Sequence, residues 1–227
     1  MSTLREKIEA FSKNKKVLSL IFVSCLLCLF FFSTIGFFSK TKIIDIGKLK
    51  EDITIKDSGH YILTGYSDQH TVSVISGNAV ITMKNLNIDV SAHENLCAFK
   101  VGNSTAVKII LEGENTLKSG DFCAGLQTQE TSFLEIARES TGKLYAQGGK
   151  FGAGIGSGAS TESLNTYVPG IGTGQYFGII SLLGGHIKAV GGKNNYSIGG
   201  DCSENDKIII NGATVSADTI CHFPTAQ

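Results

Sequence analysis

Apolar residues follow two unlike patterns along this chain of 227 residues. Residues 17–38 form one unbroken apolar run, VLSLIFVSCLLCLFFFSTIGFF, which contains no charged side chain. From about residue 59 onward, short stretches such as VSVIS, VITMK and VKIILE alternate apolar and polar side chains with a period of two. The first pattern predicts a membrane-spanning helix, and the second predicts strands with one buried face.

The apolar run is long enough to cross a bilayer as a helix. At about 1.5 Å per residue, its 22 residues span roughly 33 Å, against a hydrocarbon thickness of about 30 Å. The leader carries slightly more positive charge than the residues after the run, which favours a cytoplasmic N-terminus. A cleaved secretory signal peptide is the alternative. We expect a single-pass membrane protein with an extracytoplasmic C-terminal domain, or a secreted protein if the segment is cleaved.

The rest of the chain repeats with a unit of about 28 residues. Equivalent apolar positions are separated by 29, 27, 43 and 28 residues, and an insertion at 157–178 explains the long gap. These positions are Ile88, Leu117, Leu144, Ile187 and Val215. Repeats of this size, built of strands and glycine corners, are typical of a single-stranded parallel β-helix whose coils stack at about 4.8 Å. We therefore expect an all-β domain of about five coils after one transmembrane helix.

The expected organisation follows from these patterns. A short cytoplasmic leader precedes the transmembrane helix, and a juxtamembrane linker with the first strands leads into the repeats. The parts are leader 1–16, helix 17–38, linker and first strands 39–58, β-helix 59–222 and tail 223–227.

Composition and motifs exclude several classes of function. The chain carries 20 basic and 20 acidic side chains and thus lacks the basic footprint of a nucleic-acid-binding protein. Its glycine-rich stretches GAGIGSG and PGIGTG are not followed by the lysine-serine or lysine-threonine pair of a phosphate-binding loop. Neither a G-x-S-x-G elbow nor an H-E-x-x-H pair occurs in the sequence. We do not expect an enzyme.

Four cysteines fall in the part expected outside the cytoplasm: Cys97, Cys123, Cys202 and Cys221. Cys97 and Cys123 occupy similar places in consecutive units, so stacking would bring their Cα atoms within the range of a disulfide. A ladder of unbonded thiols is the alternative, and the parallel side chains of an internal ladder favour it. Four such cysteines are compatible with one or two disulfides in an oxidising compartment.

The insertion 157–178 is the expected place for function, because loops on a rigid scaffold commonly carry binding. Aromatic rings in and near it are candidates for presenting their faces to a sugar. Packing of these rings against the local core is the alternative. The candidate residues are Tyr167, Tyr176 and Phe177 in the insertion, with Phe151 and Tyr145 nearby.

Three acidic residues are candidate calcium ligands. Asp201, Glu204 and Asp206 offer carboxylate oxygens at short spacing, as a hard cation requires. Solvated acids of a turn are the alternative. We expect no other cofactor.

Several segments resemble one family. The stretch GHYILTGYSDQHTVSVISGNAVITMKNLNIDV, with CAFKV, LEGENTLKSG, CAGLQ and GAGIGSG, resembles bacterial secreted or surface β-helix proteins labelled carbohydrate-binding-domain proteins. These include clostridial binders of cellulose and polygalacturonate, and the similarity covers about residues 59–220. The resemblance implies a right-handed β-helix, a surface location and polysaccharide binding with calcium.

The expected function is therefore that of a membrane-anchored, extracytoplasmic module that binds a polysaccharide or a cell-surface glycan. The membrane is contacted through 17–38, and no nucleic-acid partner is expected. A structural or host-interaction surface protein that binds an unknown protein partner is the first alternative. A polysaccharide lyase or hydrolase is the second.

Overall fold

The computed structural model describes residues 41–159 and 176–221. They belong to one unit of the chain, Lys40–Gln227. The predicted transmembrane helix 17–38 and Tyr167 lie outside the described residues, as does most of the insertion 157–178. Within the two described ranges, no helix has both the length and the apolarity needed to cross a membrane.

The described chain is built of strands and one short 3-10 helix, η1 (Ile46–Lys48). An 11-stranded sheet contains β1 Lys42–Asp45, β3 Gly59–Ser67, β5 Asn78–Asp89, β7 Ala106–Glu112, β8 Glu114–Lys118, β10 Phe133–Ile136, β11 Lys143–Gln147, β13 Ile179–Leu182, β14 His186–Val190, β16 Lys207–Ile210 and β17 Thr214–Ala217. A six-stranded sheet contains β2 Ile53–Ile55, β4 Val72–Val74, β6 Phe99–Val101, β9 Leu126–Gln127, β12 Ile155–Gly156 and β15 Ile198–Gly199.

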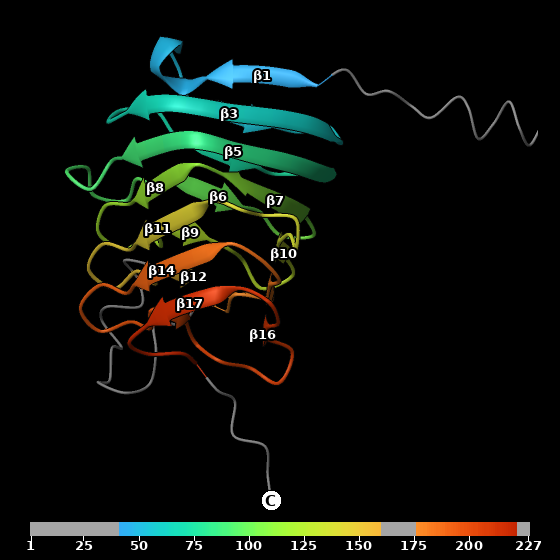
Figure 1. Ribbon diagram of the computed structural model, residues 1–227. Helices are drawn as coiled ribbons and strands as arrows, with labels where there is room; N and C mark the ends of the chain where they lie inside the picture. Colours follow the sequence, from blue (N-terminus) through green and yellow to red (C-terminus); the bar gives the residue numbers. More distant parts are fainter. Residues whose placement is uncertain (1–40, 160–175, 222–227) are drawn as a thin grey trace, which may run out of the picture. The chain divides into compact units, whose positions relative to one another are not determined.

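Every strand pairing between these elements is parallel, and each joins a strand to its counterpart in the next coil. Figure 1 shows the result as successive arrows stacked from β1 to β17. The two all-parallel sheets are those of a parallel β-helix, as the repeats predicted. The described strands stack in seven levels, from β1 to β16 and β17, against the five or so coils expected. Six levels have a strand in the second sheet, and the seventh contributes the Ile198–Ile220 bridge. Strands β1 and β2, within the predicted linker 39–58, complete the first of these coils.

The long strand β5 marks a change in the coil. It pairs with both β7 and β8, which are separate strands in the following coil. Asn85 and Gly113 lie at the bend and have positive φ angles of 51° and 68°. The Asn85 Oδ1 accepts a hydrogen bond from the Glu114 backbone N–H at 3.1 Å. The bend divides the sheet into two outward faces, one of which carries β8, β11, β14 and β17.

Apolar side chains alternate inward along each strand and fill the coil. Leu63, Ile81, Ile88, Ile109 and Leu117 are among the core residues that are fully buried. Because inward positions stack directly in register, each contributes to one continuous core along the domain.

The register corrects one equivalence in the repeat. Leu117 pairs with Ala146, and Leu144 pairs with Asn115. The sequence alignment of Leu117 with Leu144 was therefore wrong by two residues. A slip of two keeps the same side chains inward, so the hydrophobic pattern does not detect it. The other three expected steps are confirmed: Ile88–Leu117, Leu144–Ile187 and Ile187–Val215.

One corner row consists of glycine. Gly120, Gly149 and Gly192 stack in successive coils, and a Cβ on any of them would collide with backbone of the preceding coil. The double-glycine ends of the units GKLYAQGG and GHIKAVGG therefore serve close coil-to-coil approach, as their composition predicted.

The cysteines form two disulfides, Cys97–Cys123 and Cys202–Cys221, with Cα–Cα distances of 5.1 and 6.3 Å. The preference for unbonded thiols at Cys97 and Cys123 was wrong. Phe99 and Leu126 are partners in neighbouring strands. Cys97 lies two residues before Phe99, whereas Cys123 lies three residues before Leu126, so the two cysteines are not at equivalent positions. Both belong to a corner outside the central apolar cluster, where the geometry of an internal ladder does not apply. Two disulfides indicate an extracytoplasmic domain.

Candidate functional site

An open pocket of about 350 Å³ lies on the outward face of β8, β11, β14 and β17. These four strands belong to four consecutive coils and pair in parallel, so their outward side chains form rows across the sheet. Leu144 and Ile187 point into the core between the outward positions, with exposures of 1% and 2%. The outward residues that line the pocket are therefore held in place by strands whose inward side chains are packed in the core.

The first row of the pocket contains an ion pair. It consists of Glu114, Lys143, His186 and Thr214, one residue from each strand, and all four are exposed. The Lys143 Nζ donates a hydrogen bond to the Glu114 Oε1 at 2.8 Å. This bond holds the pKa of Glu114 below its ordinary value and raises the pKa of Lys143. The pair is therefore charged and mutually neutralised at neutral pH.

The second row contains the aromatic residue of the pocket. It consists of Thr116, Tyr145, Lys188 and Ser216. The Tyr145 hydroxyl donates a hydrogen bond to the Gln147 Oε1 at 2.8 Å, which fixes the ring along its strand. The Lys188 Nζ lies 5.7 Å from the centre of the Tyr145 ring. That distance is within the range of a cation–π contact.

Lysine charge exceeds carboxylate charge in the pocket. Its described lining holds Lys143, Lys188 and Glu114, and the first and last of these neutralise each other. Among the described residues, no carboxylate forms an ion pair with Lys188. The Lys188 ammonium group is therefore the net positive charge that the pocket presents to a ligand.

The structure separates the aromatic residues that the sequence grouped together. Tyr145 lines the pocket, whereas Phe177 is buried with 2% exposure and Phe151 is buried with 8%. Tyr176 is 42% exposed but is not part of the pocket lining. The alternative of local core packing therefore holds for Phe151 and Phe177.

Phe151 has a local structural role at a corner. It stacks on Phe122 of the preceding coil, with ring centres 5.5 Å apart and planes 13° apart. Both residues have positive φ angles, 66° and 67°, as do Asn95 and Asn194 in the same corner of neighbouring coils. Such a backbone is unfavourable for a bulky side chain, and stacking of the two rings offsets part of that cost.

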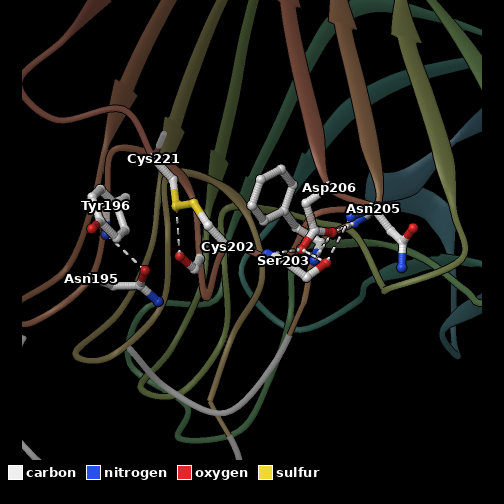
Figure 2. Close-up of a disulfide and its surroundings, with 10 residues drawn as sticks. Asn195, Tyr196, Cys202, Ser203, Asn205, Asp206 and Cys221 are labelled. Atoms are coloured by element: carbon white, nitrogen blue, oxygen red, sulfur yellow. Dashed lines mark hydrogen bonds between the residues drawn. A yellow bond between two sulfur atoms is a disulfide. The ribbon is translucent and has the colours of Figure 1, made fainter. Parts of the chain in front are cut away.

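The three candidate calcium ligands do not come together. Asp206 accepts hydrogen bonds at Oδ1 from the N–H groups of Phe177 and Gly178, at 3.1 and 2.6 Å. Its Oδ2 accepts from the Ser203 N–H and Oγ–H, both at 2.8 Å, as Figure 2 shows. Glu204 is exposed to solvent. In the part of the chain that the structure describes, no three His, Cys, Asp or Glu side chains gather as metal ligands, Asp201 included.

Asp206 and the nearby disulfide hold the last coil instead. The Asp206 hydrogen bonds tie the turn before β16 to the residues that enter β13. The Cys202–Cys221 bond connects the same turn to the residue that follows β17 and the Ile198–Ile220 bridge. Figure 2 shows these groups beside one another. This arrangement supports β17, which forms one wall of the pocket and pairs with β14 on one side.

Sequence reasoning missed most of the pocket. The repeat units GKLYAQGG and GHIKAVGG contained the signal, because their alternate positions are Lys143 and Tyr145 in one coil and His186 and Lys188 in the next. The alignment of Leu144 with Ile187 implies that these side chains are neighbours, although the prediction was not drawn from it. Binding was predicted in the insertion 157–178, and the sheet face was therefore not identified as a site.

Comparisons with protein families, with curated proteins and with solved structures give no match for this chain.

Proposed function

We propose that this protein is a membrane-anchored, extracytoplasmic module that binds a polysaccharide or cell-surface glycan on the face of β8, β11, β14 and β17. The proposal includes an anchor at 17–38 and a right-handed β-helix, the hand of nearly all parallel crossover connections. The observation that carries it is the open pocket in which the Tyr145 ring lies among polar side chains. The two disulfides and the resemblance to β-helix carbohydrate-binding proteins support the same assignment.

The chemistry of the pocket suits a sugar. A pyranose ring offers an apolar face of C–H groups and a rim of hydroxyl groups, and Tyr145 offers an apolar ring face. Thr116, Thr214 and Ser216 offer hydroxyl groups that both donate and accept hydrogen bonds. Because all of these side chains stand on paired strands, little conformational freedom is lost on binding.

The excess charge favours an acidic sugar. Lys188 is free of a carboxylate partner among the described residues, and its ammonium group lies over one face of the Tyr145 ring, whose other face is the one proposed to stack on a sugar. A charge-assisted hydrogen bond to a carboxylate or sulfate group is stronger than one to a neutral hydroxyl. We therefore expect acidic glycans to bind more tightly than neutral ones of the same length.

The carboxylate content of the pocket supports binding over hydrolysis. Hydrolysis of a glycosidic bond commonly uses two carboxyl groups, of which one must be protonated to act as an acid. Glu114 is the carboxylate in the described lining, and its hydrogen bond with Lys143 lowers its pKa. A carboxyl group in that state is a poor general acid at neutral pH.

A glycan array tests this proposal. The full chain is held in a zwitterionic detergent without a sugar headgroup, and its fold is verified by β-type circular dichroism. We expect a specific signal, strongest on acidic glycans, and parallel arrays with and without calcium measure any dependence on that ion. A folded protein that is silent across the array would overturn the proposal and favour a protein partner.

A further inference from the structure

The pocket belongs to a longer row of outward side chains. We propose that the binding site runs parallel to the stacking axis and extends past the pocket to Tyr66, so that the ligand is a linear, unbranched glycan bound along its length. This inference rests on the proposed function and adds the form of the ligand. We call the set the outer row: Tyr66, Asn87, Thr116, Tyr145, Lys188 and Ser216.

The register of the strands establishes the outer row. Each member is the Cα partner of the next, across β3–β5, β5–β8, β8–β11, β11–β14 and β14–β17. Each of these five steps is about 4.8 Å, so the row extends for about 24 Å. Four members line the pocket. Tyr66 and Asn87 continue the row over two more coils, about 10 Å beyond it.

These two additional residues are available to a ligand. The Tyr66 side chain is 55% exposed. Asn87 is exposed, while Leu86 and Ile88 on either side of it are fully buried. The alternation of the strand therefore turns Asn87 outward, on the same face as Thr116.

Ion pairs border the outer row on both sides. On one side, the Lys118 Nζ donates a hydrogen bond to the Asp89 Oδ2 at 2.8 Å. On the other side lies the Glu114–Lys143 pair. These charges are already neutralised, whereas Lys188 inside the row has no carboxylate partner among the described residues. Along β5, β8 and β11, the two ion pairs leave a strip one residue wide between them, which suits an extended chain better than the broad surface of a folded partner.

Tyrosine occurs twice along the outer row, with hydrogen-bonding side chains between the two rings. Two tyrosine rings, Tyr66 and Tyr145, stand three steps apart, about 14 Å. Asn87 and Thr116 lie between them and supply an amide and a hydroxyl. Ring faces separated by hydrogen-bonding groups suit a chain of sugars, each of which offers an apolar face and hydroxyl groups.

The test uses oligosaccharides of graded length with the full chain. The probes are disaccharides to octasaccharides of β-linked glucose, β-linked N-acetylglucosamine and α-linked galacturonic acid, titrated by calorimetry. The variants are Tyr66→Ala and Asn87→Ala, each outside the pocket. Tyr196→Ala is the matched control, because Tyr196 is exposed at 37% on a corner that is not in the row.

We expect the octasaccharide of a bound series to bind about tenfold more tightly than its tetrasaccharide, and Tyr66→Ala to weaken the octasaccharide about fivefold while leaving the tetrasaccharide unchanged. Asn87→Ala gives a smaller loss with the same dependence on length. Affinity that stops rising at the tetrasaccharide, with Tyr66→Ala equal to Tyr196→Ala, would overturn the extended row and leave the pocket in place. No binding of any series, together with a silent array, would overturn both proposals.

Discussion

The Lys188 ammonium group lies over the ring of Tyr145, with its Nζ 5.7 Å from the ring centre, although 43 residues separate the two in sequence. Their Cα atoms are partners in the parallel pairing of β11 with β14. The sequence between them includes the insertion, and β14 still pairs with β11 in register. The contact therefore depends on the stacking of coils and not on any local motif.

The charge of Lys188 is expected to control affinity for acidic glycans. The substitution Lys188→Gln should weaken binding of an acidic oligosaccharide about tenfold, because a charge-assisted hydrogen bond is replaced by a neutral one. Neutral oligosaccharides should be almost unaffected, and the loss should shrink at high salt. Titration at low and high ionic strength measures both effects. Lys193→Gln, which removes an exposed lysine on a corner, is the control, and an equal loss in both variants would contradict the assignment.

The Glu114–Lys143 pair gives a prediction for pH. The hydrogen bond from Lys143 lowers the pKa of Glu114 in the folded protein. Its contribution to stability is therefore complete above the unfolded-state pKa of about 4.3 and is lost as pH falls through the lower folded-state pKa. NMR titration of the Glu114 carboxyl carbon should give a midpoint below the ordinary value for a glutamate, and Lys143→Met should raise it. Lys143→Arg, which keeps the positive charge, is the control. If the Glu114 midpoint is the same in Lys143→Met, Lys143→Arg and the parent protein, the pair does not form.

Asn115 is expected to stabilise the bend beneath the pocket. Its side chain is 2% exposed, accepts from the Leu86 N–H at 2.9 Å and donates to the carbonyl groups of Glu112 and Lys143. Replacement by the similarly sized Asn115→Leu removes these three hydrogen bonds from a buried position. The free energy of unfolding should fall by about 3 kcal/mol, measured by chemical denaturation. Asn205→Ala, at an exposed turn residue, should change it by less than about 0.5 kcal/mol, and equal values for the two variants would refute the role of Asn115.

The two disulfides should differ in what they stabilise. Cys202–Cys221 closes the last coil, so Cys202→Ser with Cys221→Ser should speed hydrogen exchange in β17 and weaken glycan binding through Thr214 and Ser216. Cys97→Ser with Cys123→Ser affects the middle of the stack. It should lower the free energy of unfolding by about 3 kcal/mol without a selective effect on β17. Equal exchange in β17 for both double variants would contradict this division.

Much of the fold was predictable because the period of two and the repeat both depend on core positions. Ile88, Leu144 and Ile187 point into the core in the way the alternation predicts, and glycine corners follow from close approach of coils. The two-residue slip at Leu117 was not predictable, since Leu144 and Ala146 are both inward and apolar. The cysteine pairing depended on an extra corner residue before Leu126, which the alternation of strands does not record.

The site was less predictable than the fold. Phe151 and Phe177 have the composition of sugar-stacking residues, but their burial depends on a corner conformation and on contacts between coils. The acids Asp201, Glu204 and Asp206 are close in sequence, yet Asp206 uses both oxygens on backbone and serine donors. Tyr145 alone among the described candidates lies in the pocket. The pocket residues His186 and Lys188 are found only when the outward positions of neighbouring coils are compared.

The most direct test of the central claim is calorimetric titration of the tightest array glycan against the full chain and two tyrosine variants. We predict that Tyr145→Ala weakens binding at least about tenfold through loss of the ring face, with an unchanged circular dichroism spectrum, while Tyr196→Ala binds like the parent. Tyr145→Phe, which keeps the ring, should retain most of the affinity. Full affinity in Tyr145→Ala would contradict glycan binding on this face.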